Sequence, residues 1–209
     1  MLGAPISTWQ DKRREVAQAA ILEAAWTVAR EQGLASLTLR QVAARVGMQA
    51  PSLYSHFASK HAIYDAMFGQ AWRSYDEVVD ALEPRLPSEP RSALKLMART
   101  FFAFATADLA RHQLMNQRVI PDFTPSAESY APAVRVVARL REHMQRLIEI
   151  TDEDVDLYVA LVGGLADAQW ANDPGGSRYA RLLDRAVDMY ADALALPATP
   201  AGPDSQEAR

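Results

Sequence analysis

The most informative stretch of the chain is LTLRQVAARVGMQAPSLYSHFASK, residues 37–60. Thr38 starts a predicted short helix as a hydroxyl N-cap, and a glutamine three residues later is the reciprocal capping partner. Gly47 ends this helix, because helix stops favour a residue that tolerates a positive φ. Pro51 suits the first position of a second short helix, expected over about 51–57. The stretch therefore predicts two short helices joined by a glycine-containing turn.

Each of these helices has an apolar side and a polar side. Leu53 and Phe57 are four residues apart and share one face of the second helix. Its other face offers amide, hydroxyl, phenol and imidazole groups, which are the donors that base and phosphate contacts need. A pair of short helices braced by a longer one is the geometry of a helix-turn-helix, whose second helix can enter a major groove. The alternative is an ordinary solvated helix in a helical bundle.

The segment from Leu37 to Lys60 closely resembles the DNA-binding signature of TetR-type transcriptional repressors. The signature lies in a Val-Ala pair, Val-Gly at the turn, Leu-Tyr-x-His-Phe and then Ser-Lys, at fixed spacing. The resemblance extends over about 11–66. It implies an N-terminal three-helix DNA-binding domain (8–59), a helical effector-binding and dimerisation domain (60–196) and a tail expected to be disordered (197–209).

The resemblance also implies which residues reach the bases of DNA. Arg40 and Gln49 occupy positions that often do so. Ala50, Pro51 and Ser52 stand at the entry of the recognition helix, where apolar contact with a thymine methyl group or a hydroxyl contact is feasible. Ala50 departs from members that carry a larger polar residue there, so base specificity at that contact is open.

A second group of residues is implied to hold the DNA backbone. Thr38 corresponds to the family's cap residue that also touches phosphate, and Tyr54, His56 and Lys60 fall where the family clamps phosphates. For Arg30 and Arg45 we prefer a role in surface solubility. The run Lys12-Arg13-Arg14 is either a flexible arm for the minor groove or a solvated helix start.

The distribution of charge supports a DNA partner more than its total does. The chain of 209 residues has 22 Lys and Arg against 26 Asp and Glu, a net charge of −4. Residues 1–60 carry seven basic and four acidic groups, whereas residues 61–209 carry 15 and 22. A head of +3 therefore precedes a body of −7, an asymmetry that favours a basic module attached to an acidic body.

The rest of the chain also has helical periodicity, so the predicted fold class is all-α. Proline and glycine mark the breaks between helices, and the segment 83–90 holds three prolines. The helices are expected over 11–32, 60–82, 90–108, 110–119, 126–150, 152–171 and 177–196.

The resemblance implies a small-molecule effector, and the body has an aromatic and methionine-rich set that could line an apolar pocket. Plain core is the simpler interpretation of each apolar member, while Asp108 with His112, or Arg99, could give the pocket a polar end. The effector-binding candidates are Trp72, Arg99, Phe101, Phe102, Ala105, Asp108, His112, Met115, Phe123, Tyr130, Tyr158, Leu161 and Trp170.

The last two predicted helices have the pattern of a dimer interface. Two amphipathic helices from each subunit would form a four-helix seam about a two-fold axis, and such a homodimer should bind an inverted-repeat operator. The candidates are Val155, Val159, Val162, Gly163, Leu165, Ala166, Leu182, Leu183, Ala186, Val187 and Tyr190.

Other classes of function have little support. The sequence has no cysteine, no glycine-rich phosphate loop and no nucleophile elbow, so we predict no catalytic residue, no metal and no cofactor. No apolar stretch approaches a membrane span, and we expect a cytoplasmic protein. The prediction is a ligand-responsive repressor that binds double-stranded operator DNA; a regulator without a small-molecule effector, or an activator, is the alternative.

Overall fold

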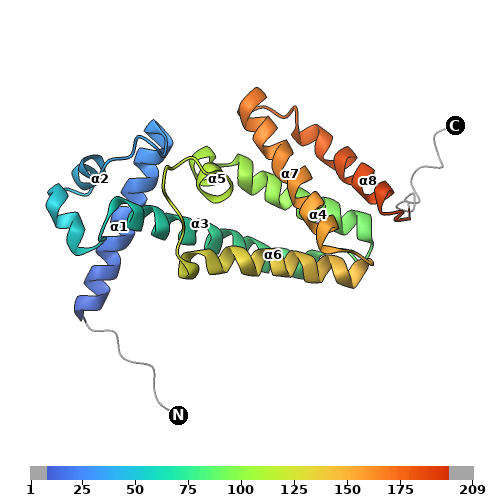
Figure 1. The fold of residues 1–209 in the computed structure, drawn as a ribbon, viewed down its shortest axis with the longest axis horizontal. Helices are drawn as coiled ribbons and strands as arrows, with labels where there is room; N and C mark the ends of the chain where they lie inside the picture. Colours follow the sequence, from blue (N-terminus) through green and yellow to red (C-terminus); the bar gives the residue numbers. More distant parts are fainter. Residues whose placement is uncertain (1–8, 198–209) are drawn as a thin grey trace, which may run out of the picture. The chain divides into compact units, whose positions relative to one another are not determined.

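The computed structural model describes residues 9–197, and every regular element in that range is helical (Figure 1). This confirms the predicted all-α class. The predicted tail, apart from Pro197, lies outside the described residues. The elements are α1 (Trp9–Gln32), α2 (Leu39–Arg45), η1 (Ala50–Ser55), α3 (Lys60–Leu82), η2 (Glu83–Arg85), α4 (Pro90–Thr106), α5 (Leu109–Asn116), α6 (Ala127–Leu147), α7 (Asp152–Asn172), η3 (Ala180–Leu182) and α8 (Leu183–Ala193).

Two expected helices are wrong in type or extent. The segment predicted as an α-helix over 51–57 is the 3₁₀ helix η1, held by bonds of the i to i+3 kind such as Ser52 N–H to the Gln49 carbonyl (2.9 Å). The helix predicted over 177–196 begins only at Leu183, after the turn η3. Side chains at the end of α7 hold the turn before it, since the Asp173 carboxylate accepts the Arg178 N–H (2.8 Å) and the Gln169 side-chain oxygen accepts the Tyr179 N–H (2.9 Å).

The chain divides into two compact units. Unit one consists of residues up to 73 together with 108–132, and unit two of residues 74–107 together with those from 133 onward. The predicted domain boundary at residue 60 is at the start of α3, whereas the chain passes between these units inside α3, between α4 and α5, and inside α6.

Unit one encloses a core made by α1, α2, η1 and the first half of α3. Ile21, Val42, Leu53 and Ile63 are all buried there. Tyr64 is also buried, and its hydroxyl donates to the Leu34 carbonyl (2.5 Å), which fastens the loop after α1 to α3. Burial raises the pKa of Tyr64 to about 12, so this hydroxyl keeps its proton.

Unit two is built on α4, which packs against both α7 and α8. Its buried cluster includes Leu94, Phe102, Val162 and Val187. The cluster also contains two buried tyrosines, and both hydroxyl groups have partners: Tyr158 donates to the Leu94 carbonyl (2.6 Å) and Tyr190 to the Asp154 carbonyl (2.9 Å).

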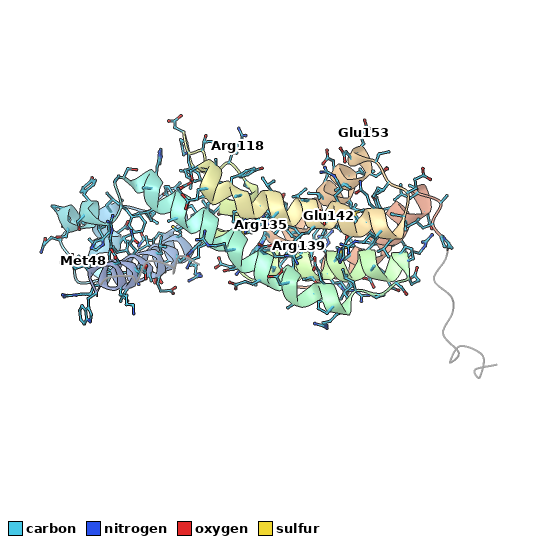
Figure 2. The ribbon with its side chains drawn as sticks, turned by 90° about the horizontal axis from the view of Figure 1, so that it is seen from below. Met48, Arg118, Arg135, Arg139, Glu142 and Glu153 are labelled. Carbon is cyan, nitrogen blue, oxygen red and sulfur yellow. The ribbon has the colours of Figure 1, made fainter. Side chains whose placement is uncertain are left out.

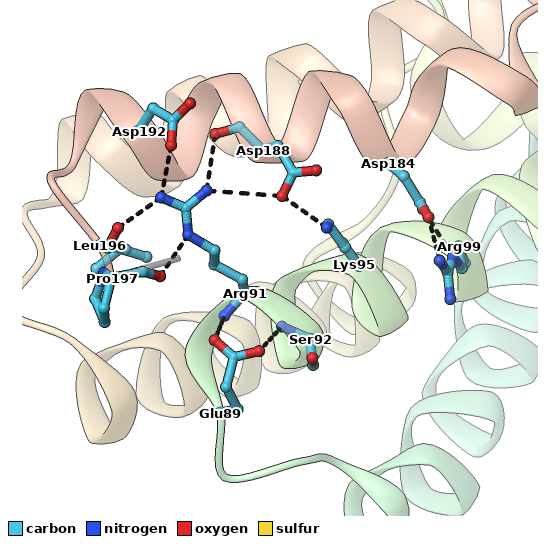
Figure 3. Close-up of polar contacts among 10 residues, drawn as sticks. All are labelled: Glu89, Arg91, Ser92, Lys95, Arg99, Asp184, Asp188, Asp192, Leu196 and Pro197. Atoms are coloured by element: carbon cyan, nitrogen blue, oxygen red, sulfur yellow. Dashed lines mark hydrogen bonds and ion pairs between the residues drawn. The ribbon is translucent and has the colours of Figure 1, made fainter. Parts of the chain in front are cut away.

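A ladder of ion pairs fixes α8 on α4 (Figure 3). Basic residues at four-residue spacing on α4 meet acidic residues at the same spacing on α8, in reverse order. The pairs are Arg91 with Asp192 (2.6 Å), Lys95 with Asp188 (2.6 Å) and Arg99 with Asp184 (2.8 Å). The match sets the register of two antiparallel helices.

A second charged network joins α3 and α6 within unit two. The Arg139 guanidinium meets carboxylates of Asp76 (2.9 Å), Asp80 (2.7 Å) and Glu83 (2.9 Å), and Arg135 also reaches Asp76 (3.1 Å). Figure 2 labels Arg135 and Arg139 on α6. Hydrogen bonding from Arg139 lowers the pKa of Glu83 below its ordinary value.

Candidate nucleic-acid interface

Helix α2 begins with the capping box that the sequence predicts. The Gln41 N–H donates to the Thr38 hydroxyl (3.3 Å), and the Thr38 N–H donates to the Gln41 side-chain oxygen (3.0 Å). Thr38 is extended, with φ −124° and ψ 148°, as an N-cap residue should be. The local sequence therefore fixes where α2 starts.

The turn after α2 depends on Gly47. Its φ of +69° lies in the left-handed region, which glycine adopts without the steric cost of a side chain. The chain reverses there, and the Met48 N–H returns to the Ala43 carbonyl (2.9 Å). This turn places η1 against α2 as the second element of a helix-turn-helix.

The segment 49–56, which we call the recognition segment, has two faces. Leu53 is only 1% exposed and packs into the core of unit one, while the neighbouring Tyr54 is 59% exposed. Gln49, Pro51 and Ser52 are exposed as well. The recognition segment therefore has the predicted apolar and polar faces, although it forms a 3₁₀ helix.

The residue that ties the recognition segment to α1 was missed by the sequence analysis. The Gln18 side-chain amide donates to the His56 carbonyl (3.1 Å), across 38 residues of sequence. Its position three residues before the buried Ile21 is the only signal that could have pointed to it. His56 is half-buried, and its Nδ1 atom is enclosed with no hydrogen-bond partner in residues 9–197.

Lys60 lies at the start of α3 and reaches back toward the loop before α2. Its ammonium group is 3.5 Å from the Ala35 carbonyl oxygen and 5.3 Å from the centre of the Tyr64 ring. Partial burial lowers the pKa of Lys60. The fold thus brings Lys60, near the end of the motif, close to the segment that leads into Thr38.

Three arginines of α1 and α2 differ in their ion pairs. Arg45 pairs with Glu31 and Arg30 with Asp108 (2.8 Å), in keeping with structural surface roles. Arg40 is exposed and has no ion pair among the described residues. Of these three, Arg40 is the one whose guanidinium is available to a ligand.

Lys12, Arg13 and Arg14 are part of the first turns of α1. Of the two interpretations of this basic run, the structure supports the solvated helix start over the flexible arm. All three residues are exposed.

Six effector candidates belong to unit one. Asp108 is committed to local structure, because its carboxylate caps α5 through the Arg111 N–H (3.1 Å) and pairs with Arg30. Phe68 stacks on the exposed Tyr130, with ring centres 6.0 Å apart. In order of burial the six are the buried Trp72, His112 and Met115, the half-buried Asp108 and Phe123, and the exposed Tyr130.

The other seven effector candidates belong to unit two. Arg99 is exposed and donates to Asp184 from α8, so its charge is used in the ladder. The Trp170 indole N–H donates to the Ala105 carbonyl (3.0 Å). The seven are the buried Phe102, Ala105 and Tyr158, the half-buried Phe101, Leu161 and Trp170, and the exposed Arg99.

The dimer candidates divide between core and surface. Those that face the core of unit two cannot present a side chain to a second copy without unpacking; they are Val155, Val162, Ala166, Leu183, Val187 and Tyr190. Val159 and Leu182 are exposed, and Gly163, Leu165 and Ala186 are half-buried. Leu157, 57% exposed, and Met189, 63% exposed, are apolar surface residues that the periodicity did not single out.

Residues 9–197 hold neither a cluster of metal-ligating side chains nor a helix apolar and long enough to span a bilayer.

The comparisons with known proteins agree with this geometry. Residues 21–67 match the family model of bacterial regulatory proteins of the tetR family. A segment of 81 residues is 36% identical to the class A tetracycline repressor protein from transposon 1721 of Escherichia coli. That match covers 39% of this chain and 36% of the repressor, about a third of its length.

Solved structures extend the likeness in fold to most of the chain. A protein of unknown function from Rhodococcus sp. RHA1 superposes with a TM-score of 0.71 at 19% identity, covering 85% of this chain and 95% of its own. The transcriptional regulator FadR from Bacillus subtilis, in complex with stearoyl-CoA, gives 0.60 at 15% identity, over 82% and 96%. Both show the shared all-helical fold.

Proposed function

Through its DNA-binding domain this chain belongs to the tetR family of bacterial regulatory proteins, and we propose that it represses transcription from an inverted-repeat operator. The observation that carries the proposal is the two-faced recognition segment. Leu53 anchors it in the core while Gln49, Ser52 and Tyr54 face outward behind a capped α2 and a glycine turn. Proteins with the fold of this family are generally not enzymes. We place this protein in the cytoplasm, where it would meet its DNA.

The residues divide by the part of DNA that they would touch. We assign base contacts in the major groove to Arg40, Gln49 and the entry residues Ala50, Pro51 and Ser52. The backbone contacts fall to the other DNA-binding candidates, Thr38, Tyr54, His56 and Lys60. Lys60 is well suited because its ammonium group is a mobile point charge on a long stem.

The exposed apolar residues of α7 and α8 favour a homodimer. Leu157 and Val159 on α7, with Leu182 and Met189 at α8, leave apolar surface on the two helices that the seam would use. Two copies related by a two-fold axis would present two recognition segments to one duplex, and an inverted repeat is the sequence that matches such symmetry.

Release by a small, largely apolar ligand is the last part of the proposal. The relatives support it: one is a tetracycline repressor, and FadR is solved with stearoyl-CoA. Within unit two, the half-buried Phe101, Leu161 and Trp170 offer apolar surface for such a ligand. The ligand would act only if it binds the DNA-free state more tightly than the DNA-bound state.

Selection of duplexes from a random pool by the full-length chain tests the DNA-binding function. The expected product is an inverted repeat, bound by one dimer as judged by light scattering of the complex. Failure to enrich any sequence would sink the proposal, and enrichment of an isolated half-site would reject the dimeric mode.

Thermal melting with stearoyl-CoA and with tetracycline tests ligand release, because a compound that binds only the folded state raises the melting temperature. A compound that raises it should also dissociate the selected duplex. Stabilisation without dissociation contradicts release. If the bound protein raises transcription from a reporter carrying the selected duplex, it is the activator of the alternative.

A further inference from the structure

The first turns of α1 extend beyond the core of unit one. The first buried side chain of this helix is Ile21, whereas every residue from Trp9 to Val16 is exposed. Twelve residues of helix therefore precede the first fully buried side chain, and the first eight of them are all exposed.

The register of α1 brings one residue of this extension toward the recognition segment. Gln18 contacts the His56 carbonyl, so its face of α1 meets the end of that segment. Arg14 is four residues earlier and lies on the same face, about 6 Å further along the helix axis. Long helical side chains also lean toward the N-terminus, which carries Arg14 further past His56.

Arg14 has no other use in the described part of the chain. It is exposed, and no ion pair or hydrogen bond engages its guanidinium within residues 9–197. Its neighbour Arg13 lies over the Trp9 ring, 5.4 Å from the ring centre, and is partly engaged. An unpaired guanidinium beside a DNA-binding surface can bind a backbone phosphate, because two parallel N–H groups can donate to its oxygen atoms.

Lys12 lies on a different side of the helix. Two residues turn an α-helix by about 200°, so Lys12 and Arg14 point in nearly opposite directions. Lys12 lines a shallow groove along α1 with Trp9, Arg13 and Val16, and Arg14 does not. The two residues carry the same charge on the same exposed helix, which makes Lys12 a matched control.

We propose that Arg14 is a DNA phosphate contact that continues the backbone-binding surface of the recognition segment along α1. This rests on the DNA-binding function proposed above. The contact adds affinity without sequence preference, because a phosphate is the same at every base pair. The operator footprint of each half-site therefore includes one phosphate that the helix-turn-helix itself does not reach.

The test compares Arg14→Ala with Lys12→Ala, using the inverted repeat selected by the wild-type chain. Gel-shift titrations at salt concentrations from about 50 to about 200 mM give the slope of log affinity against log salt. Arg14→Ala should weaken binding, and the slope of the dimer should fall by about two, one for each lost phosphate contact. The ratio of wild-type affinity to Arg14→Ala affinity should then fall roughly tenfold between the lowest and the highest salt concentration. Lys12→Ala should change the slope by much less.

Phosphate ethylation interference supplies the direct readout. One phosphate in each half-site should interfere with the wild-type chain and lose its interference in Arg14→Ala, while the ranking of base-substituted duplexes stays the same. Equal losses of DNA affinity in Arg14→Ala and Lys12→Ala would mean a general charge effect and overturn the contact. An unchanged DNA affinity of Arg14→Ala would overturn it as well. If Tyr54→Ala still weakens binding in that case, the proposed function survives and only the contact fails.

Discussion

Two adjacent residues of the recognition segment have different roles, one in stability and one in DNA binding. Leu53 is 1% exposed and Tyr54 is 59% exposed, so one holds the segment and the other is offered to DNA. Leu53→Ala should cost about 2–5 kcal/mol of unfolding free energy, because it leaves a cavity in the core of unit one. Tyr54→Ala should leave unfolding unchanged and weaken binding of the selected duplex. Urea unfolding and gel-shift titration separate the two effects, and Tyr54→Phe reports how much depends on the hydroxyl.

Lys60 makes the second prediction at this scale. Its ammonium group lies over Tyr64 and near the Ala35 carbonyl, in position to meet a phosphate beside Thr38. Lys60→Gln keeps most of the side-chain length and removes the charge, so it should weaken DNA binding and reduce the salt slope by about one per half-site. Analytical ultracentrifugation should find the same oligomeric state as wild type. An unchanged slope would remove Lys60 from the phosphate contacts.

At the scale of elements, the α4–α8 ladder has one strong position and two weak ones. Arg91 is buried and donates to the Pro197 (2.6 Å) and Leu196 (2.5 Å) carbonyls as well as to Asp192. Arg91→Met should therefore destabilise unit two by about 1–3 kcal/mol, because it removes the hydrogen bonds of a buried guanidinium to both carbonyls and to Asp192. Arg99→Met should cost under about 1 kcal/mol, since Arg99 and Asp184 are both solvated. Urea midpoints of the two variants compare them directly, and equal losses would contradict the difference in burial.

The elements also show which sequence signals were reliable. The capping box at Thr38 and the positive φ at Gly47 depend on neighbouring residues alone, and the structure has both. The type of η1 and the late start of α8 were mispredicted. Each depends on bonds that periodicity does not describe, such as those by which the Asp173 and Gln169 side chains accept the Arg178 and Tyr179 N–H groups before the last helix.

For the whole molecule, acid should destabilise the fold. Hydrogen bonding lowers the pKa of Glu83, through Arg139, and of Asp184, through Arg99. A carboxylate with a lowered pKa contributes its stability above its unfolded value, near pH 4, and loses it as the pH falls through the folded value. The melting temperature should therefore fall as the pH drops below about 4. Asp184→Asn should reduce that fall, and a melting temperature that rises in acid would contradict the sign.

The uneven distribution of charge along the chain also affects how the whole molecule meets DNA. A basic N-terminal segment and an acidic remainder favour DNA contact through one part of the chain, although the net charge of −4 is unfavourable to it. The total charge is an average over parts that act separately.

Residue type and spacing are enough to predict the all-α class, the helix-turn-helix with the N-cap of its first helix, and most of the side chains that face outward from it. These features follow from contacts between residues close in sequence. Long-range packing, in contrast, sets which apolar residues of α7 and α8 are core and which are surface, and it brings Gln18 to the recognition segment. A helical stripe records that a side chain is apolar but not which neighbour covers it, because that neighbour comes from a distant part of the chain.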